Sequence, residues 1–292
     1  MKYIEQPLVF PCAGDELVGI LARPERSSAI GVVIVVGGPQ YRAGSHRQFV
    51  LLARALAAAG YPVLRFDYRG MGDSGGEARN FEAAGQDIGA AINALLDACP
   101  EVGRVVLWGL CDGASAALLY CHETADGRVD GLVLANPWVR SETTLARTQV
   151  KHYYGQRLLQ REFWAKLLRG ELAVGKSLLG LWRTVRLSRA GQGAAPARRS
   201  FQAAMAEAWR KFPGAILVVL SGQDYVAKEF MEYAKSDPGW TGLLERKGVR
   251  RALLTEADHT FSAQTARHQV EAIVVQWLQQ QEWGAERQRL AG

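Results

Sequence analysis

Long hydrophobic runs are absent from the sequence, and cysteine is scarce. No apolar stretch approaches the roughly 18 residues that a membrane-spanning helix requires, so no transmembrane segment is expected. The 292 residues include four cysteines, with no Cys-x-x-Cys pair and no metal-ligand spacing to histidine. The sequence therefore indicates neither a metal site nor a disulfide framework.

The first residues also lack the apolar stretch of a signal peptide, because Glu5 stands where that stretch would begin. We therefore expect a cytoplasmic protein. Apolar residues make up 48% of the chain and charged residues 22%, a balance typical of a soluble protein with a sizeable core. Within such a core, Cys12, Cys99 and Cys121 are best interpreted as small buried apolar side chains.

Acidic residues are scarce in one segment only. Residues 138–212 hold 15 Lys and Arg against 4 Asp and Glu, whereas the rest of the chain is net acidic and the whole carries +6. This concentration of positive charge favours an anionic or carrier-bound partner for the segment. No groove-binding motif accompanies the basic residues, so nucleic acid is not an expected partner.

Short apolar strands alternate with helices along most of the chain. Segment 31–36 reads Gly-Val-Val-Ile-Val-Val, which is typical of a strand buried on both faces of a parallel sheet. The apolar stretches 3–10 and 17–22 flank a Gly-Asp turn and predict a hairpin. We predict a mostly parallel, doubly wound α/β sheet with an antiparallel N-terminal edge. The other predicted strands are 61–66, 104–108, 131–135, 215–220 and 251–255, and helices are predicted at 81–98, 114–122, 228–235 and 264–280.

A further helix is predicted soon after the strand 31–36. Ser45 and Gln48 have the spacing of a capping box at its start, with the hydroxyl capping one end and the amide reaching back. Phe49, Leu52 and Leu56 then recur at helical spacing.

The alternation breaks at Trp138, and for some 75 residues the pattern is helical without a strand. We predict that 138–212 is a basic helical cap inserted into a core made of 1–137 and 213–292. It would lie over the carboxyl edge of the sheet, where such folds bind ligands. Its aromatic residues fit either a small helical core with a solvated charged face or a lid that lines an acyl pocket. The tryptophans in question are Trp138, Trp164, Trp182 and Trp209.

The turn Gly109-Leu110-Cys111-Asp112-Gly113 lies between a predicted strand and a predicted helix. This is the context of a nucleophile elbow, a sharp turn that needs small flanking residues and projects its central side chain above the sheet edge. At a helix N-terminus, beside a protonated histidine, a thiol is driven toward the nucleophilic thiolate. Cys111 is therefore the predicted nucleophile.

An acid and a base follow in the chain order that such an elbow requires. Asp224 stands in the loop after the strand 215–220, and His259 in the loop after the last strand. We predict that His259 is the base and that Asp224 fixes its tautomer. Asp258 and Asp112 are the alternative acids.

The second half of an oxyanion hole is less clear in the sequence. One donor should be the backbone N–H of Asp112, the residue after the nucleophile. The other normally comes from the loop that follows the strand 31–36, but Pro39 has no N–H to give. The remaining candidates are Gly38 and Gln40.

Two further residues near these loops are weaker candidates for contacts to a substrate. They are His46, in the first turn after the oxyanion loop, and Trp138, at the start of the basic segment. The other histidines are interpreted as structural or solvent-facing. The Asp-x-Arg-Gly-x-Gly-Asp-Ser run at 67–74 is interpreted as a tight structural loop.

Together these motifs resemble the α/β-hydrolase superfamily, and more narrowly the first of the two hydrolases associated with the exosortase A system. The residues that carry the resemblance are Gly-Gly-Pro-Gln at 37–40, Gly-Ser-His-Arg at 44–47, the run from Phe66 to Ser74, Trp108 to Gly113, and the Asp224 and His259 loops. The resemblance implies a cytoplasmic bacterial hydrolase, encoded near exopolysaccharide and protein-sorting functions, with Cys111, Asp224 and His259 as its triad.

The sequence departs from the wider superfamily at two positions. Most members carry serine at the elbow and often a histidine before the first glycine of the oxyanion loop, where Cys111 and Gly37 stand here. A cysteine elbow is similar to that of dienelactone hydrolase, which supports an active thiol.

Three functions are compatible with these residues, and we expect the first. The first is hydrolysis of an ester, lactone or thioester through a thioacyl-enzyme, which needs no metal or organic cofactor. The second is acyl transfer to a sugar hydroxyl or amine by the same residues. The third is a non-catalytic factor that grips an anionic glycan, an acidic carrier protein or a membrane surface with its basic segment. The sequence leaves the oligomeric state open.

Overall fold

The structure is a computed structural model that describes residues 2–38, 40–140, 200–281 and 283. It divides into two compact units, Met1–Trp138 with Phe201–Gly292, and Val139–Ser200. The predicted cap at 138–212 falls largely on 141–199, outside the described residues, and stays a prediction. The description below concerns the first unit, to which the last helix of that segment also belongs.

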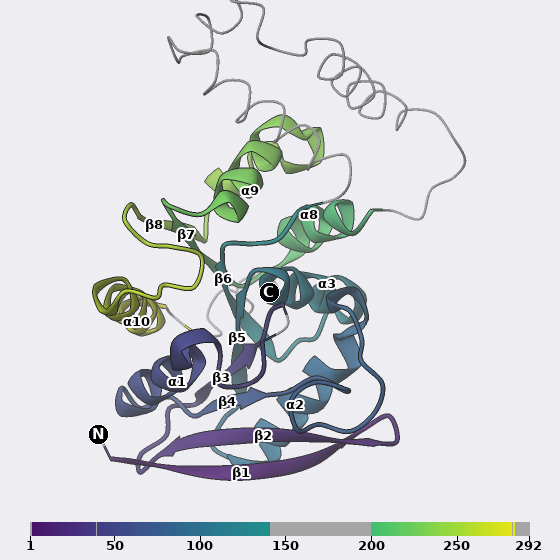
Figure 1. The fold of residues 1–292 in the computed structure, drawn as a ribbon, viewed down its shortest axis with the longest axis vertical. Helices are drawn as coiled ribbons and strands as arrows, with labels where there is room; N and C mark the ends of the chain where they lie inside the picture. Colours follow the sequence, from purple (N-terminus) through teal and green to yellow (C-terminus); the bar gives the residue numbers. More distant parts are fainter. Residues whose placement is uncertain (1, 39, 141–199, 282, 284–292) are drawn as a thin grey trace, which may run out of the picture. The chain divides into compact units, whose positions relative to one another are not determined.

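In the described part of the chain, eight strands form one sheet in the order β1-β2-β4-β3-β5-β6-β7-β8 (Figure 1). The β1–β2 and β2–β4 pairs are antiparallel and the others are parallel. This confirms the predicted mostly parallel sheet with an antiparallel N-terminal edge. The strands are β1 (Tyr3–Cys12), β2 (Asp15–Pro24), β3 (Ile30–Val35), β4 (Val63–Phe66), β5 (Arg104–Leu110), β6 (Val129–Ala135), β7 (Ala215–Ser221) and β8 (Val249–Leu254).

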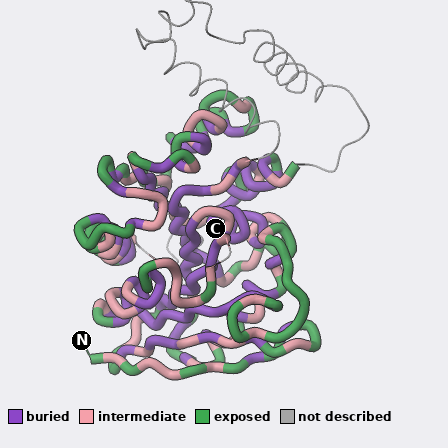
Figure 2. Tube along the Cα trace, viewed as in Figure 1, coloured by how far each residue is buried: buried purple, intermediate pink, exposed green. Residues whose placement is uncertain are grey.

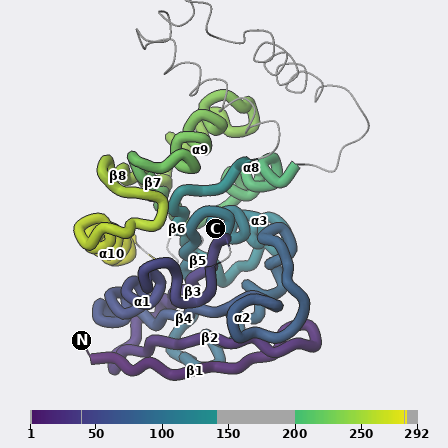
Figure 3. The backbone as a smooth tube through the Cα atoms, viewed as in Figure 1, coloured from purple at the N-terminus to yellow at the C-terminus, as the bar shows by residue number. Residues whose placement is uncertain are grey.

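Helices cover both faces of this sheet (Figures 1 and 3). α1 (Gln48–Ala58) and α10 (Gln264–Gln280) contact each other on one face, while α2 (Gly85–Ala98), α3 (Asp112–Thr124) and α8 (Phe201–Lys211) pack together on the other. α9 (Tyr225–Ser236) joins α8 through ring contacts among Trp209, Phe230 and Trp240. Short 3-10 turns lie at Ser45–Arg47, Phe81–Ala83, Pro238–Trp240 and Leu243–Glu245. None of the helices described here combines the length and hydrophobicity of a bilayer crossing.

Burial follows the position of each strand in the sheet (Figure 2). Every residue of β3, β4 and β6 is buried, because strands in the middle of the sheet are covered on both faces. The edge strand β8 is largely exposed and presents Arg250 and Arg251. Charges of this kind discourage a second strand from pairing with the edge.

The predicted capping box at the start of the first helix is wrong. Ser45 opens a 3-10 turn, α1 begins at Gln48, and neither start has a side-chain cap. The Gln48 amide Nε2 instead donates to Oε1 of Gln40, and the Ser45 backbone N–H donates to the same oxygen. Gln40 of the oxyanion loop thus accepts the Ser45 N–H that Gln48 would accept in a capping box, and it also accepts the Gln48 amide.

Trp209, one of the tryptophans considered for a lid, is fully buried in the first unit. Its Nε1–H donates to the Leu243 carbonyl at 3.0 Å. This side chain therefore belongs to the core of the first unit.

Backbone segments approach one another closely at the end of β5. A Cβ added to Gly109 would lie 2.5 Å from the Gly113 carbonyl oxygen, and one added to Gly113 would lie 2.5 Å from that of Val35. Both contacts are to backbone, which cannot rotate away as a side chain can. Glycine is therefore required at position 109 for the turn to close on itself, and at position 113 for α3 to pack against the end of β3.

We predict that Gly113→Ala lowers the free energy of unfolding by about 1–3 kcal/mol, because its methyl group forces the end of β3 away from α3. Gly103→Ala is the matched control, since nothing lies within 4 Å of its added Cβ, and it should change stability by less than about 0.5 kcal/mol. Urea unfolding of both variants checks this. Equal midpoints would contradict the packing described here.

Candidate active site

Cys111 connects the end of β5 to the start of α3 in a strained turn. Its backbone has φ 59° and ψ −125°, a region that L-residues adopt at a cost of about 1–3 kcal/mol and mostly at functional sites. The Cys111 N–H donates to the Ala135 carbonyl at 2.9 Å, which ties the turn to β6. The side chain is partly exposed.

The carbonyl of Cys111 organises the residues around the elbow. It accepts the N–H of Ala114 at 3.1 Å and that of Trp138 at 3.2 Å, and Ser115 Oγ donates to the Trp138 carbonyl at 2.6 Å. The predicted substrate contact Trp138 is therefore fixed by its backbone beside the elbow. Its role toward a substrate stays a prediction.

Asp224 lies two strands away from Cys111 along the same edge of the sheet, where β7 leads into α9. Its carboxylate caps the helix by accepting the N–H groups of Val226 and Ala227, both at 3.1 Å. The same carboxylate, through Oδ2, lies 2.8 Å from Nδ1 of His259. The N–H groups at the start of α9 therefore fix the orientation of the carboxylate that contacts the imidazole.

The predicted acid and base are thus in direct contact. With Nδ1–H donating to Asp224, Nε2 of His259 is left to act as a base. The His259 side chain is 31% exposed, whereas that of Asp224 is 7% exposed, so the imidazole is reachable while its partner is not. Asp258, the alternative acid, accepts instead from the backbone N–H and the hydroxyl of Ser262.

Two loops are joined along their backbones, and this brings the pair together. The Gly222 N–H donates to the Leu254 carbonyl at 2.8 Å, and the Gln223 N–H donates to the Ala257 carbonyl at 3.0 Å. A Cβ at Gly222 would collide with the Thr255 carbonyl oxygen. Backbone hydrogen bonds therefore hold the loop that carries Asp224 against the loop that carries His259.

Asn136, which the sequence analysis did not single out, forms hydrogen bonds to both loops. It is fully buried at the end of β6 with φ 44°. Its Nδ2 donates to Ser221 Oγ at 2.9 Å and to the His259 carbonyl at 3.1 Å, while its Oδ1 accepts the Ser221 N–H at 2.8 Å. The available signal was Asn-Pro directly after a buried strand, which alone indicates only a turn.

The two carboxylates of this edge have opposite electrostatic surroundings. Burial raises the pKa of Asp224, but the hydrogen bond and charge of His259 and the helix N–H groups outweigh burial and hold that pKa below its ordinary value. For Asp112, burial dominates and raises the pKa, although backbone N–H groups and the charge of His259 oppose it.

The oxyanion loop lies directly on the elbow. A Cβ at Gly37 would collide with the Leu110 carbonyl oxygen and would lie 2.6 Å from Oδ1 of Asp112. The Gly38 N–H donates to that same Oδ1. Gln40, the other candidate donor, has its side-chain oxygen engaged by the start of α1, and Pro39 lies outside the described residues.

His46 has a left-handed backbone with φ 53°, followed by Arg47 with φ 61°. Both side chains are exposed. The predicted contact of His46 with a substrate remains a prediction.

The Asp-x-Arg-Gly-x-Gly-Asp-Ser run holds the oxyanion loop in place. Asp67, fully buried, accepts the Arg42 backbone N–H at 2.6 Å and pairs with the Arg42 guanidinium. The Asp73 N–H and the Ser74 hydroxyl donate back to Asp67, and Arg69 pairs with buried Asp87 at 2.6 Å. The motif is therefore structural, as predicted, with Asp67 and Arg69 buried and Asp73 exposed.

The other cysteines differ from Cys111 in their surroundings. Cys12 and Cys99 are buried, as predicted, whereas Cys121 is partly exposed and does not fit that interpretation. Burial raises the pKa of Cys12 to about 11, helped by the hydrogen bond to Asp87, and burial also raises the pKa of Cys99. These two thiols therefore hold their protons at neutral pH.

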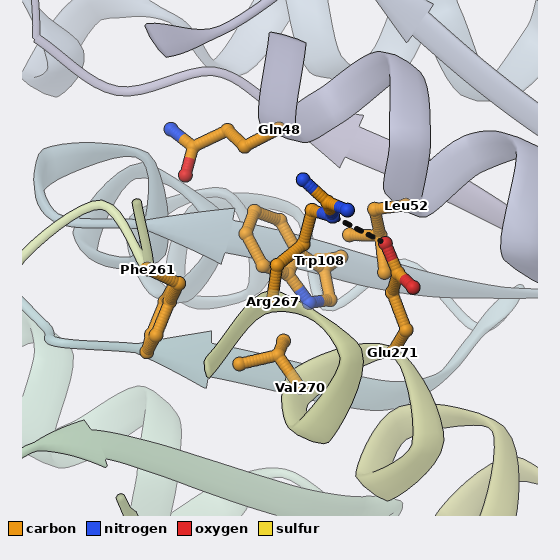
Figure 4. A pocket seen from close by; sticks show the side chains of 7 residues that line it. All are labelled: Gln48, Leu52, Trp108, Phe261, Arg267, Val270 and Glu271. Carbon is orange, nitrogen blue, oxygen red and sulfur yellow. Dashed lines mark ion pairs between the residues drawn. The ribbon is translucent and has the colours of Figure 1, made fainter. Parts of the chain in front are cut away.

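A small cavity lies between α1, β5 and α10 (Figure 4). It encloses about 20 Å³, room for one water-sized molecule. Arg267 and Glu271, one turn apart on α10, form an ion pair at 3.5 Å beside it. None of Cys111, Asp224 and His259 lines it. The lining residues are Gln48, Leu52, Trp108, Phe261, Arg267, Val270 and Glu271.

Comparison with known proteins now decides the family. The family described as serine aminopeptidase, S33, matches residues 27–173, about half of the chain. The chain belongs to this family of hydrolases. Its elbow carries Cys111 where the Gly-x-Ser-x-Gly pattern of α/β-hydrolases has serine. No curated protein matches the chain.

Several solved structures, each less than 20% identical in sequence, have a similar fold. An esterase of Pyrococcus furiosus has 16% identity and a TM-score of 0.64, covering 96% of this chain and 92% of its own. Est1E of Butyrivibrio proteoclasticus, with ferulic acid bound, has 16% identity and a TM-score of 0.61, covering 94% and 98%. A CIB-like hydrolase of Thermoplasma acidophilum has 13% identity and a TM-score of 0.57, covering 95% and 99%. The S33 hydrolase chain thus has an α/β-hydrolase fold.

We predict that Asp224→Asn weakens the dependence of stability on acidic pH. The pKa of Asp224 is lower in the folded protein than the value of about 3.9 in an unfolded chain, so the folded state binds this proton less readily. The resulting stabilisation is complete above about pH 5 and is lost as pH falls through the lowered pKa.

Between about pH 6 and pH 3, wild type should therefore lose more unfolding free energy than Asp224→Asn, measured by urea titration at each pH. Asp97→Asn, which removes an exposed acid of α2, should follow the wild-type curve. Parallel curves for wild type and Asp224→Asn would contradict the assigned ion pair.

Proposed function

We propose that this protein hydrolyses a carboxylic ester, lactone or thioester through a Cys111–His259–Asp224 triad. The observation that carries the proposal is the strained turn at Cys111, φ 59° and ψ −125° at the start of α3, on the sheet edge that also holds the Asp224–His259 pair. Strain of this kind persists where the surrounding structure enforces it, and it exposes the side chain to a substrate.

The first half of the reaction forms a thioester. The Cys111 thiolate attacks the carbonyl carbon and forms a C–S bond, while the carbonyl electron pair moves onto oxygen. Collapse of this tetrahedral species breaks the bond to the leaving group, which takes a proton from Nε2 of His259. Asp224 keeps Nδ1–H oriented and stabilises the imidazolium.

The second half releases the acid. Nε2 of His259 takes a proton from water, whose oxygen attacks the thioester carbon, and collapse returns the Cys111 thiolate. Because water here competes with any other nucleophile, transfer of the acyl group to a hydroxyl or amine uses the same residues. That transfer is the variant that product analysis separates from hydrolysis.

The motif resemblance supports a cytoplasmic role beside exopolysaccharide and exosortase functions. The basic composition of 138–212 supports an anionic or carrier-bound substrate, and His46 and Trp138 are proposed to contact it. A non-catalytic anion-binding role for the basic segment remains the competing proposal, and it requires no acylation of Cys111.

The decisive experiment is intact-mass analysis after incubation with p-nitrophenyl esters of several acids, including acetate and ferulate, the latter because the Butyrivibrio neighbour was solved with ferulic acid. We expect a mass increase equal to one acyl group, mapped by peptide analysis to Cys111. The increase should persist in Cys121→Ala, the other partly exposed cysteine, and vanish in Cys111→Ala. Wild-type turnover by Cys111→Ala would overturn the proposal.

The acid assignment has its own test. Asp224→Asn should lower kcat/KM by about 100-fold or more, because the imidazole loses its orienting charge. Asp258→Asn, which alters a carboxylate that accepts from Ser262, should cost far less. If Asp258→Asn is the more damaging change on p-nitrophenyl acetate, the acid of the triad is Asp258.

A further inference from the structure

The side chain of Asp112 lies where an oxyanion hole is expected. Asp112 is the first residue of α3, and its Oδ1 accepts the N–H of Gly38 from the loop after β3. Burial raises the pKa of this carboxylate, and backbone N–H groups, that of Gly38 first among them, oppose the effect. The carboxylate thus joins the start of α3 to the loop after β3.

The Gly38 N–H is one of the donors that the proposed reaction needs. An oxyanion hole consists of N–H groups directed at the position where negative charge develops on the carbonyl oxygen. Here the N–H groups of Asp112 and Gly38 are the candidates for that role, and the Gly38 N–H already donates to the carboxylate of Asp112. A carboxylate oxygen has the charge and the acceptor geometry of the tetrahedral oxyanion, so it stands in for one.

The fit is tight enough to exclude simultaneous occupation. A Cβ at Gly37 would lie 2.6 Å from Oδ1 of Asp112, so the carboxylate fills the space between the oxyanion loop and the elbow. A substrate oxygen that used the Gly38 donor would overlap this oxygen. It would also meet its negative charge while becoming negative itself.

We propose that the Asp112 carboxylate closes the oxyanion hole of the unliganded protein and must leave it before Cys111 can be acylated. The inference rests on the proposed function. An acid in the first turn of a helix also stabilises that helix, and this ordinary role predicts a different outcome. A purely structural Asp112 would make its removal neutral or harmful to acylation, whereas a closing side chain makes its removal beneficial.

The test compares two reactions of the same thiol in Asp112→Ala, Asp112→Asn and wild type. Acylation is followed as the burst of p-nitrophenol from p-nitrophenyl acetate, and alkylation as modification of Cys111 by iodoacetamide. Alkylation at a saturated carbon develops no oxyanion, whereas acylation does. Both need the thiolate, so their ratio cancels any change in thiolate population caused by the lost charge.

We expect the ratio of acylation to alkylation to rise by about tenfold or more in Asp112→Ala, because an oxyanion donor is worth about 100- to 1,000-fold and is released only in part. Asp112→Asn retains an accepting oxygen without the charge and should fall between the two. Asp97→Ala, which removes a remote exposed acid, should match wild type. Unfolding curves of each variant verify that the fold is retained, and the near-isosteric Asp112→Asn decides the matter if Asp112→Ala is unstable.

The outcomes separate this inference from the function on which it rests. If Cys111 is acylated but the ratio is unchanged or lower without the carboxylate, the closing role is overturned and the triad stands. If Cys111 is alkylated yet none of the variants is acylated, both the closing role and the proposed acyl chemistry are overturned.

Discussion

The close approach of three backbone segments around Cys111 is the constraint on which the rest of the site depends. Gly113 contacts the end of β3, Gly109 contacts the turn itself, and Gly37 rests on the elbow. Without side chains at these positions, the turn can hold Cys111 at φ 59°. The same contacts press the oxyanion loop against the start of α3, which is why Asp112 and Gly38 meet.

Around Asp224 and His259, the same edge is held together by hydrogen bonds instead of close backbone packing. Its two loops are joined by backbone hydrogen bonds, and the buried amide of Asn136 fastens both of them to β6. The helix start of α9 then fixes the Asp224 carboxylate on His259. Strain at the elbow holds Cys111 and satisfied polar contacts hold the Asp224–His259 pair, whereas the Asp112 carboxylate occupies the position proposed for the oxyanion. The two carboxylates differ accordingly, because one is charge-paired and the other mainly desolvated.

Much of this arrangement could be predicted from the sequence, and the reasons are local. The strands β3, β5, β6 and β7 are continuous apolar runs, and an acid and a histidine at the ends of later strands are brought to one edge by parallel topology. What could not be predicted depends on contacts between distant segments. The amide of Gln48 turned to Gln40 instead of forming a capping box, and Asn136 acts on residues 85 and 123 positions away. The side chain of Asp112 was considered as an acid, but its contact with Gly38 is visible only in three dimensions.

The account as a whole requires an ionised thiol at Cys111, and the most direct measurement is the ultraviolet absorbance of its thiolate. The difference spectrum between wild type and Cys111→Ala would be recorded as pH is raised, and again in a His259→Ala background. The account predicts that Cys111 contributes thiolate absorbance already near neutral pH and that this contribution disappears without His259. It would be contradicted if the Cys111 signal emerged only in the alkaline range of an ordinary thiol, about pH 8.5, whether or not His259 is present.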